Sequence, residues 1–442
     1  MNYNEIPQRG LRARSAFLRK ISAAAVLAAW LLAGPILTLP AGDESIPDRS
    51  GQPAVQRTDL LDGLGVTRWH AAGVRGAGVK VAVLDSGFRG YRKFLGSSLP
   101  ETITTRSFRS DGNLEAKDSQ HGILCGEVIH TLAPSADLMF ANWEPDRPES
   151  FLEAVRWAKK EGARVITCSV IMPSWSDGEG HGSVHDALSR ILENKKEGGD
   201  VVFFASAGNT AKRHWSGAFH DRGDGYHEWE PGKIENTLSR LGNERVSIEL
   251  FWKRGPDYDL KVVDRDTDET VASSTARQNG HRGCTVARFY PQPDHRYAVE
   301  VHRARGSSAG SFHLVALSTG SELEFADYHG SVCFPADGPE VVAVGAVDST
   351  GQRMPYSSCG PILTETKPDL VARVPFPSQW REMPFGGTSA ASPQAAALAA
   401  LWLSRDPSLT STQVRRQLRS SASCLNKSGP SCETGFGLIR LP

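Results

Sequence analysis

Four polar residues stand where the sequence predicts that a strand ends or a helix begins. They are Asp85, His121, Asn209 and Ser389. Ser389 follows a pair of glycines and precedes an apolar run to Leu403, which predicts a buried helix with Pro393 in its first turn. A hydroxyl at a helix N-terminus lies where unpaired backbone N–H groups stabilise an anion forming on a substrate carbonyl. Ser389 is therefore a candidate nucleophile, although the pattern also fits a Ser/Thr cap on an ordinary core helix.

Asp85, His121 and Asn209 are of the residue types that a Ser nucleophile requires. A Ser hydroxyl is weak until a base takes its proton, an imidazole suits that task, and a carboxylate on the other ring nitrogen fixes the tautomer. An amide N–H can stabilise the resulting oxyanion. Each residue also has a simpler interpretation, because an Asp after a strand is commonly a turn residue and a His at a helix start commonly lies on the surface.

The elements around these residues alternate between strand and helix. Predicted strands are a run ending at Asp85 and residues 136–141, 164–171, 200–209 and 334–347; predicted helices are 121–132, 149–161, 184–196 and 393–403. This alternation predicts an α/β fold with a doubly wound, mostly parallel sheet. Asp85 then lies at the carboxyl end of a strand, where open α/β sheets place their sites.

Four motifs in this order resemble the subtilisin-like serine proteases, or subtilases. They are VAVLDSGF around Asp85, the His-Gly start of a helix at His121, SAGN ending at Asn209, and GGTSAASP around Ser389. The order Asp, His, Ser separates this family from the chymotrypsin-like and α/β-hydrolase arrangements. The resemblance covers roughly 300 residues, so a chance match of single motifs does not explain it.

The resemblance implies a subtilisin-like fold and a monomeric serine endopeptidase acting on proteins or peptides. Ser389 would be the nucleophile, His121 the general base and Asp85 the residue that orients His121. Asn209 and the backbone N–H of Ser389 would form the oxyanion hole. The resemblance also implies substrate-binding residues at two strand ends, with no required cofactor and no catalytic metal. These residues are Ser169, Val170, Ile171, Ala207 and Gly208.

The chain departs from the family pattern at Ile123, where Thr is usual, and at Ile171, where Gly is usual beside the substrate. A side chain at position 171 would narrow the groove or shift the P1 and P4 pockets, so the family does not predict the substrate preference. The alternative function is a non-catalytic peptide-binding protein with an occluded groove. The inhibitor-like propeptide of many subtilases has no room between Leu39 and Thr58, so folding without one is expected.

More than a hundred residues separate Asn209 from Phe334, where compact members of the family need a short loop. Polar and apolar residues alternate at period two in residues 245–252, 258–263, 285–290, 296–302 and 311–317. This pattern predicts an antiparallel β-sandwich inserted at residues 212–330, between peptidase segments 58–211 and 331–442. The strand pattern is similar to the small jelly-roll (pre-peptidase C-terminal-like) domains of secreted bacterial peptidases.

Two motifs of the predicted insert have alternative interpretations. Asp221, Asp224 and Glu228 offer oxygen ligands for a structural calcium ion, or form an acidic turn without a metal. Residues 306–310 (GSSAG) match the nucleophile elbow of esterases, with Ser308 as the nucleophile. Their position between two predicted strands favours a hairpin turn.

The N-terminal segment indicates export, because basic residues precede an uncharged run from Ile21 to Leu39. Residues 1–42 are predicted to be a signal peptide or a membrane anchor, and residues 43–57 a linker. Both interpretations place the body outside the cytoplasm, as a secreted, periplasmic or membrane-anchored protein. Basic and acidic residues number 50 each, so no basic excess indicates a nucleic-acid partner.

Seven cysteines are an odd number, so at least one cannot join an intramolecular disulfide in an oxidising compartment. Cys424 and Cys432 flank a short loop and are predicted to form a disulfide. Cys125 lies four residues after His121. It is similar in position to the Cys that packs beneath the catalytic His in proteinase K-like subtilases.

Overall fold

The structure is a computed structural model that describes residues 57–253, 255–275, 277–279, 282–305, 310–318, 320–360 and 367–442. Its largest sheet has seven strands in the order β16-β15-β5-β4-β1-β3-β2, and all neighbours pair in parallel. The strands are β1 (Lys80–Leu84), β2 (Thr104–Phe108), β3 (Asp137–Trp143), β4 (Ala163–Cys168), β5 (Val202–Ser206), β15 (Val341–Val347) and β16 (Leu370–Arg373).

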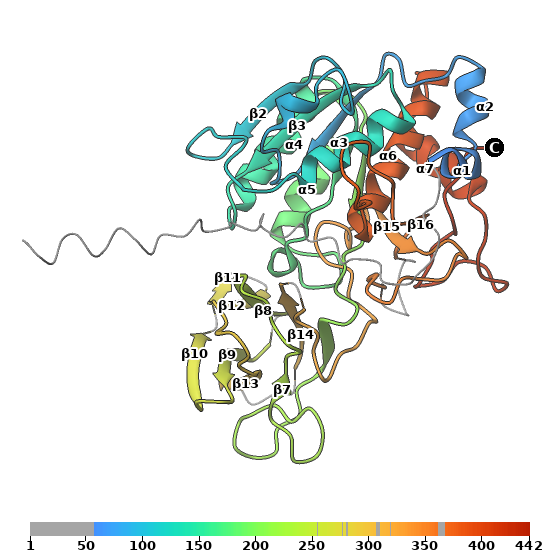
Figure 1. Ribbon diagram of the computed structural model, residues 1–442. Coiled ribbons are helices and arrows are strands. Elements are labelled where there is room, and N and C mark those ends of the chain that lie inside the picture. Colours follow the sequence, from blue (N-terminus) through green and yellow to red (C-terminus); the bar gives the residue numbers. More distant parts are fainter. Residues whose placement is uncertain are drawn as a thin grey trace, which may run out of the picture. The chain divides into compact units, whose positions relative to one another are not determined.

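Helices cover both faces of this sheet, because its central strands are apolar on both sides (Figure 1). Val81 and Val83 of β1 belong to the core shared with α3 (His121–Leu132) and α6 (Gly387–Arg405). Ala82 and Leu84 belong to the opposite core, with α4 (Pro148–Lys160) and α5 (Ser183–Glu193). The predicted doubly wound α/β fold is therefore confirmed, and its sheet is entirely parallel.

The remaining helices are α1 (Arg57–Gly63), α2 (Val66–Ala71), α7 (Ser411–Ser421) and the short 3₁₀ helices η1 (Tyr91–Phe94) and η2 (Pro173–Trp175). The side chain of Thr410 accepts from the N–H of Gln413 and begins α7 with a capping box. Within the described residues, no helix combines the length and the apolar character that crossing a membrane requires.

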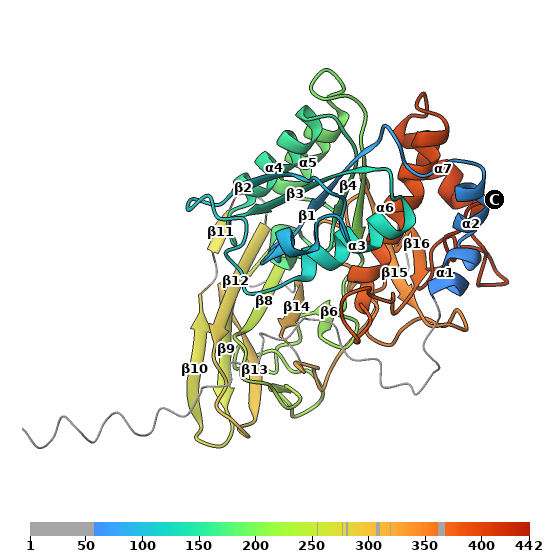
Figure 2. The ribbon, with the colours of Figure 1, turned by 45° about the horizontal axis from the view of Figure 1, so that its top comes forward.

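Residues 214–317 form two antiparallel sheets, called the sandwich below (Figure 2). One sheet has the order β10-β9-β13-β7 and the other β11-β12-β8-β14-β6. The strands are β6 (His214–Ala218), β7 (Asn236–Thr237), β8 (Val246–Lys253), β9 (Asp257–Asp264), β10 (Glu269–Ser274), β11 (Arg277–Asn279), β12 (Arg282–Phe289), β13 (Tyr297–Arg305) and β14 (Ser311–Leu317). Inward side chains such as Trp252, Tyr258 and Phe312 fill one buried core between them.

The structure corrects three local predictions and leaves others outside the described residues. The strand predicted at 334–347 begins only at Val341, because residues 334–340 form turns. The strand predicted at 164–171 ends at Cys168, so residues 169–171 leave the sheet as an extended segment. Helix α6 begins at Gly387, so Pro393 lies inside the helix and not in its first turn. The N-terminal segment 1–42, the linker up to residue 56 and Ser308 lie outside the described residues, and the boundaries 58–211, 212–330 and 331–442 remain predictions.

Candidate active site

Asp85 and His121 form a hydrogen-bonded pair at the carboxyl end of β1. Asp85 directly follows β1, and its side chain is fully buried. The Nδ1 atom of His121 lies 2.7 Å from Oδ2 of Asp85. The other carboxylate oxygen accepts the N–H groups of Ser86 at 2.7 Å and Gly87 at 3.0 Å. These contacts fix the carboxylate, and His121 donates through Nδ1, which leaves the Nε2 side of the ring to accept a proton.

The electrostatics of this pair favour an ionised carboxylate. Burial alone would raise the pKa of Asp85, but the charge and hydrogen bond of His121, together with the N–H of Gly87, lower this pKa below its ordinary value. At neutral pH Asp85 is therefore negative and stabilises a positive charge on the neighbouring imidazole.

A glycine allows the start of α3 to reach the end of β1. The N–H of Gly122 donates to the carbonyl of Gly87 at 2.7 Å. A Cβ atom on Gly122 would stand 2.9 Å from Cβ of Asp85 and 2.5 Å from Cε1 of Phe88. Because no side chain fits there, the motif His-Gly brings the imidazole within hydrogen-bonding distance of the carboxylate.

Ser389 lies in the first turn of α6, and its carbonyl is freed by the proline inside that helix. Pro393 has no N–H to donate to the carbonyl four residues earlier, which is that of Ser389. The hydroxyl of Ser169 donates to this carbonyl at 3.2 Å instead. In return, Oγ of Ser389 donates to the carbonyl of Ser169 at 3.5 Å. The nucleophile candidate is thus held beside the segment that follows β4.

The thiol of Cys125 connects the two halves of the site. Its Sγ atom lies 4.0 Å from Oδ2 of Asp85 and 3.8 Å from the carbonyl oxygen of Ser389. Cys125 is buried one turn after His121 on α3. The structure therefore brings Asp85, His121 and Ser389 together around one thiol.

Asn209 is oriented by the residue that precedes the nucleophile candidate. Both the N–H and the hydroxyl of Thr388 donate to Oδ1 of Asn209 at 3.0 Å. This fixes which end of the amide faces Thr388, so Nδ2 points the other way. Nδ2 lies 2.9 Å from the point where a Cβ on Gly387 would stand, and Gly387 has a φ of 74°. Thr388 therefore orients the side chain of Asn209. The motif around Ser389 does not by itself predict this contact.

Two segments that follow neighbouring strands flank Ser389. Because β4 and β5 pair in parallel, residues 169–171 and 207–209 leave the sheet side by side. The N–H of Ala207 donates to the carbonyl of Val344 at 2.9 Å, and the carbonyl of Gly208 accepts from Ser358 at 2.9 Å. Val170 packs against the core that contains α4 and α5.

Ile171 points in a different direction from Val170, toward the sandwich. It packs against a small buried cluster of Phe251 from β8, Val315 from β14, and Cys333. The next residue along the chain is Met172, whose N–H donates to the carbonyl of Phe334 at 2.9 Å. The departure from glycine at position 171 therefore provides a contact with the sandwich.

A buried carboxylate provides a second contact between the sandwich and this segment. Oε2 of Glu249, on β8, accepts the N–H of Ser174 at 3.0 Å. Burial raises the pKa of Glu249, although the hydrogen bonds from Ser174 oppose this effect. The sequence carried a signal for this interface, because Phe251 lies on the face of β8 that alternation would assign to solvent.

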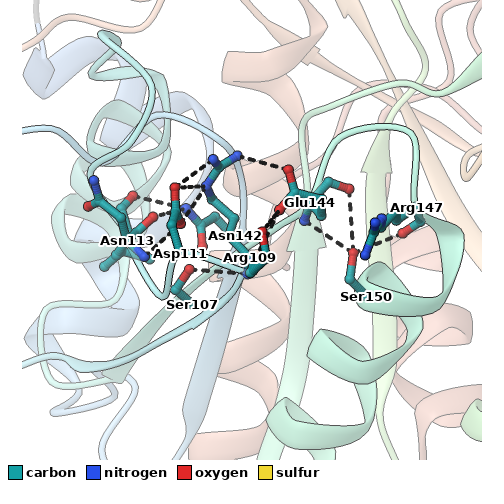
Figure 3. A network of polar contacts seen from close by, with 10 residues as sticks. Ser107, Arg109, Asp111, Asn113, Asn142, Glu144, Arg147 and Ser150 are labelled. Carbon is teal, nitrogen blue, oxygen red and sulfur yellow. Dashed lines mark hydrogen bonds and ion pairs between the residues drawn. The ribbon is translucent and has the colours of Figure 1, made fainter. Parts of the chain in front are cut away.

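A polar network holds the loop that leads from β2 to His121 (Figure 3). Arg109 pairs with Glu144 across 3.6 Å, which joins the residues beyond the ends of β2 and β3. Nδ2 of the buried Asn142 donates to the carbonyls of residues 113 and 114 at 3.0 and 3.1 Å. The loop before α3 is therefore attached to the sheet.

The predicted calcium ligands do not share a site. Asp221, Asp224 and Glu228, all within the described residues, do not form a group within metal-binding distance of one another. Oδ1 of Asp221 accepts the N–H groups of residues 223 and 225 at 2.7 and 3.0 Å, and Oε1 of Glu228 accepts from residue 232 at 2.6 Å. This arrangement is that of an acidic turn closed by its own backbone.

The disulfide predicted between Cys424 and Cys432 is not formed in the structure. Both residues are thiols, and Sγ of Cys424 donates to the carbonyl of Asn426 at 2.9 Å. The sulfur of Cys424 therefore makes a local hydrogen bond, and not the bond to Cys432 that the loop spacing predicts.

Comparisons with known proteins identify the family of the chain and its fold. The sequence pattern of the subtilase family matches residues 76–248 and 264–437. Subtilisin DY from Bacillus licheniformis is 40% identical over 214 residues, which cover 47% of this chain and 72% of that protein. The thermostable alkaline protease of Halalkalibacterium halodurans is 37% identical over 231 residues, which cover 50% of this chain and 58% of that protein.

Other curated relatives are matched over less of their length. Subtilisin E from Bacillus subtilis is 38% identical, with 29% of this chain and 32% of that protein covered. Among solved structures, the Clostridium perfringens CspB protease superposes with a TM-score of 0.60 at 14% identity, covering 87% of this chain and 97% of that one. The structural likeness supports the fold alone, whereas the sequence match to the family model shows the family.

Proposed function

The chain belongs to the subtilase family of serine-type endopeptidases, and on this basis we propose that it cuts peptide chains through an acyl-enzyme on Ser389. The observation that carries the proposal is the 2.7 Å contact between Asp85 and His121 beside Ser389. A buried carboxylate on Nδ1 of an imidazole is the arrangement that makes a neighbouring hydroxyl nucleophilic.

In the first step, Oγ of Ser389 attacks the scissile carbonyl carbon while His121 takes the hydroxyl proton on Nε2. A C–O bond forms, and the carbonyl electrons move onto its oxygen. Asp85 stabilises the imidazolium without accepting its proton. The amide of Asn209 and the backbone N–H of Ser389 donate to the oxyanion, a type of contact worth about 10²–10³ in rate for each donor.

The intermediate then loses its amine. The C–N bond breaks, and His121 gives its proton to the leaving nitrogen. Water attacks the resulting ester with His121 again acting as base, which releases the acid and restores Ser389. These steps use groups of the chain, the substrate and water.

The substrate lies between the segments that flank the nucleophile. Ser169, Val170 and Ile171 form one edge, and Ala207 and Gly208 form the other. An extended peptide can add to such edges through main-chain hydrogen bonds. The export pattern of residues 1–42 supports action outside the cytoplasm, on protein or peptide substrates.

A fluorophosphonate probe tests the proposal, because it reacts with an activated Ser. The probe should label the purified protein, and Ser389→Ala should remove the label. The rival function, a non-catalytic peptide-binding protein, predicts no label on a folded protein. An esterase acting through Ser308 predicts that the label survives the loss of Ser389.

A further inference from the structure

The side chain next to the scissile carbonyl must fit between two chain segments. Oγ of Ser389 faces the carbonyl of Ser169 at 3.5 Å, and Asn209 is tied to Thr388 on the other side. A carbonyl that meets both Ser389 and Asn209 belongs to a residue lying against residues 169–171 and 207–208. Its side chain, P1 of the substrate, therefore points toward the gap between these segments.

Ile171 occupies this gap. Its Cγ2 atom lies 3.7 Å from the point where a Cβ on Gly208 would stand. Oγ of Ser358 lies 2.9 Å and Oγ1 of Thr210 lies 3.6 Å from the same point. Gly208 has a φ of 107°, a conformation that favours glycine. The gap is therefore bounded by the backbone of Gly208 on one side and by the side chain of Ile171 on the other.

The sandwich prevents Ile171 from moving away. The side chain of Ile171 packs against Phe251 and Val315. These two residues lie on β8 and β14, on the side of the sandwich that meets the segment after β4. Phe251 is stacked on His313 at a centroid distance of 5.1 Å, so this wall is itself packed. Two backbone hydrogen bonds hold the segment after Ile171. The N–H of Met172 donates to the carbonyl of Phe334, and the N–H of Ser174 donates to the carboxylate of Glu249.

We infer that Ile171, supported by the sandwich, restricts P1 to small residues such as Gly, Ala or Ser. The inference rests on the proposed peptidase function and names the substrate class of that site. A packed interior resists the addition of atoms, so Leu, Phe or Lys at P1 must displace either Ile171 or the scissile bond. Ile171 is then the residue that determines specificity.

The test uses the full chain and extended fluorogenic peptides that differ only at P1, with active sites titrated by the fluorophosphonate probe. The wild type should cleave the Ala peptide with a kcat/KM about tenfold or more above that of the Leu and Phe peptides. Equal or better cleavage of the Leu or Phe peptide would overturn the inference alone. Absence of labelling would overturn the proposed function and this inference with it.

Two substitutions assign the effect to Ile171. Ile171→Ala should raise kcat/KM for the Leu and Phe peptides by about tenfold relative to the Ala peptide, mainly through KM. Leu317→Ala is the matched control, because Leu317 packs against the same small cluster as Ile171 but lies outside residues 169–171 and 207–208, and it should keep the wild-type profile. Ile171→Val should retain a preference for Ala, and an unchanged profile in a folded Ile171→Ala would contradict the assignment. Where Ile171→Ala does not fold, the wild-type and Ile171→Val profiles decide.

Discussion

The hydroxyl of Ser169 donates to the carbonyl oxygen of Ser389 across 3.2 Å. That carbonyl is available because Pro393 cannot donate to it within α6. One missing backbone N–H thus couples the first turn of α6 to the segment beyond β4. The position of Ser389, the candidate nucleophile, depends on this contact as well as on its own helix.

Loss of any member of the Asp85, His121 and Ser389 set should remove nearly all peptidase activity. The three act as a unit, so each single Ala substitution should lower kcat by several orders of magnitude. Activity on a peptide and circular dichroism would be measured together. A folded His121→Ala protein with more than a small fraction of wild-type turnover would contradict the assignment.

Asn209→Ala should lower kcat by about 10²–10³ with little change in KM, because the amide acts on the oxyanion that exists only in the transition state. Thr388→Val, which removes the hydroxyl donor to Oδ1 of Asn209, should produce a smaller loss of the same kind. Steady-state kinetics on one peptide would separate kcat from KM. Unchanged turnover in Asn209→Ala would show that another group forms the oxyanion hole.

A mercurial should inactivate the enzyme through Cys125. A bulky metal on its sulfur cannot fit between Asp85 and the carbonyl of Ser389, which lie 4.0 and 3.8 Å away. Cys125→Ala should therefore resist the reagent while remaining active. Inactivation of Cys125→Ala at the wild-type rate would place the sensitive thiol elsewhere.

The sandwich should lose stability as the pH falls below about 6.5. His214 is buried and His313 is partly buried, their ring nitrogens lie 3.0 Å apart, and loss of solvation lowers their pKa values to about 4 and about 3. Between pH 4 and 6.5 the unfolded chain binds protons that the folded chain does not, so the free energy of unfolding decreases as the pH falls. For each histidine, this loss is about 1.4 kcal/mol for every pH unit of the window.

Denaturant titrations followed by Trp fluorescence would measure this dependence, because Trp252 lies in the sandwich core. His313→Asn should flatten the change between pH 4 and 6.5. His295→Asn is the control and should leave the slope unchanged, since the hydrogen bond to Asp264 raises the pKa of His295, which is therefore protonated in both the folded and the unfolded chain over this window. Equal pH dependence in His313→Asn and the wild type would contradict the prediction.

Replacement of residues 212–330 by a short Gly/Ser loop should change activity on folded proteins more than on short peptides. The sandwich adjoins the substrate edge through Ile171 and Glu249, so its bulk is expected to favour flexible, extended substrates. The comparison is kcat/KM for a peptide and for a folded protein, in both enzymes. If the wild type cleaves the folded protein as readily as a well-folded deletion variant, the sandwich does not restrict access.

The sequence could predict residues whose role is carried by local motifs. Asp85, His121, Asn209 and Ser389 each sit at an element boundary marked by glycine or by the end of an apolar run. Periodicity does not reveal strands with weak apolar patterns, such as β2, whose residues are mostly exposed or partly exposed at the edge of the sheet. The four-residue β16 is mostly apolar and buried, but it is too short for a period to be recognised.

The direction of Ile171 and the role of Glu249 could not be predicted from local pattern. Both depend on which face of β8 meets the segment after β4, and these parts are far apart in the sequence. The role of Thr388, on α6, likewise depends on a contact with Asn209, which follows β5 and is far away in the sequence. Contacts between distant parts of the chain give these residues their roles. In the sequence such contacts show only as breaks in the alternation of polar and apolar residues, such as Phe251 in β8.

Strands β5 and β15 are neighbours in the parallel sheet, pairing Val341 with Phe203, yet the whole sandwich lies between them in the chain. During synthesis the ribosome therefore delivers Asp85, His121 and Asn209 first, then the sandwich, and Ser389 after it. Pairs with large sequence separation form late, unless an intervening unit has folded and brought its ends together. The set of Asp85, His121 and Ser389 is therefore complete only after the sandwich has been synthesised.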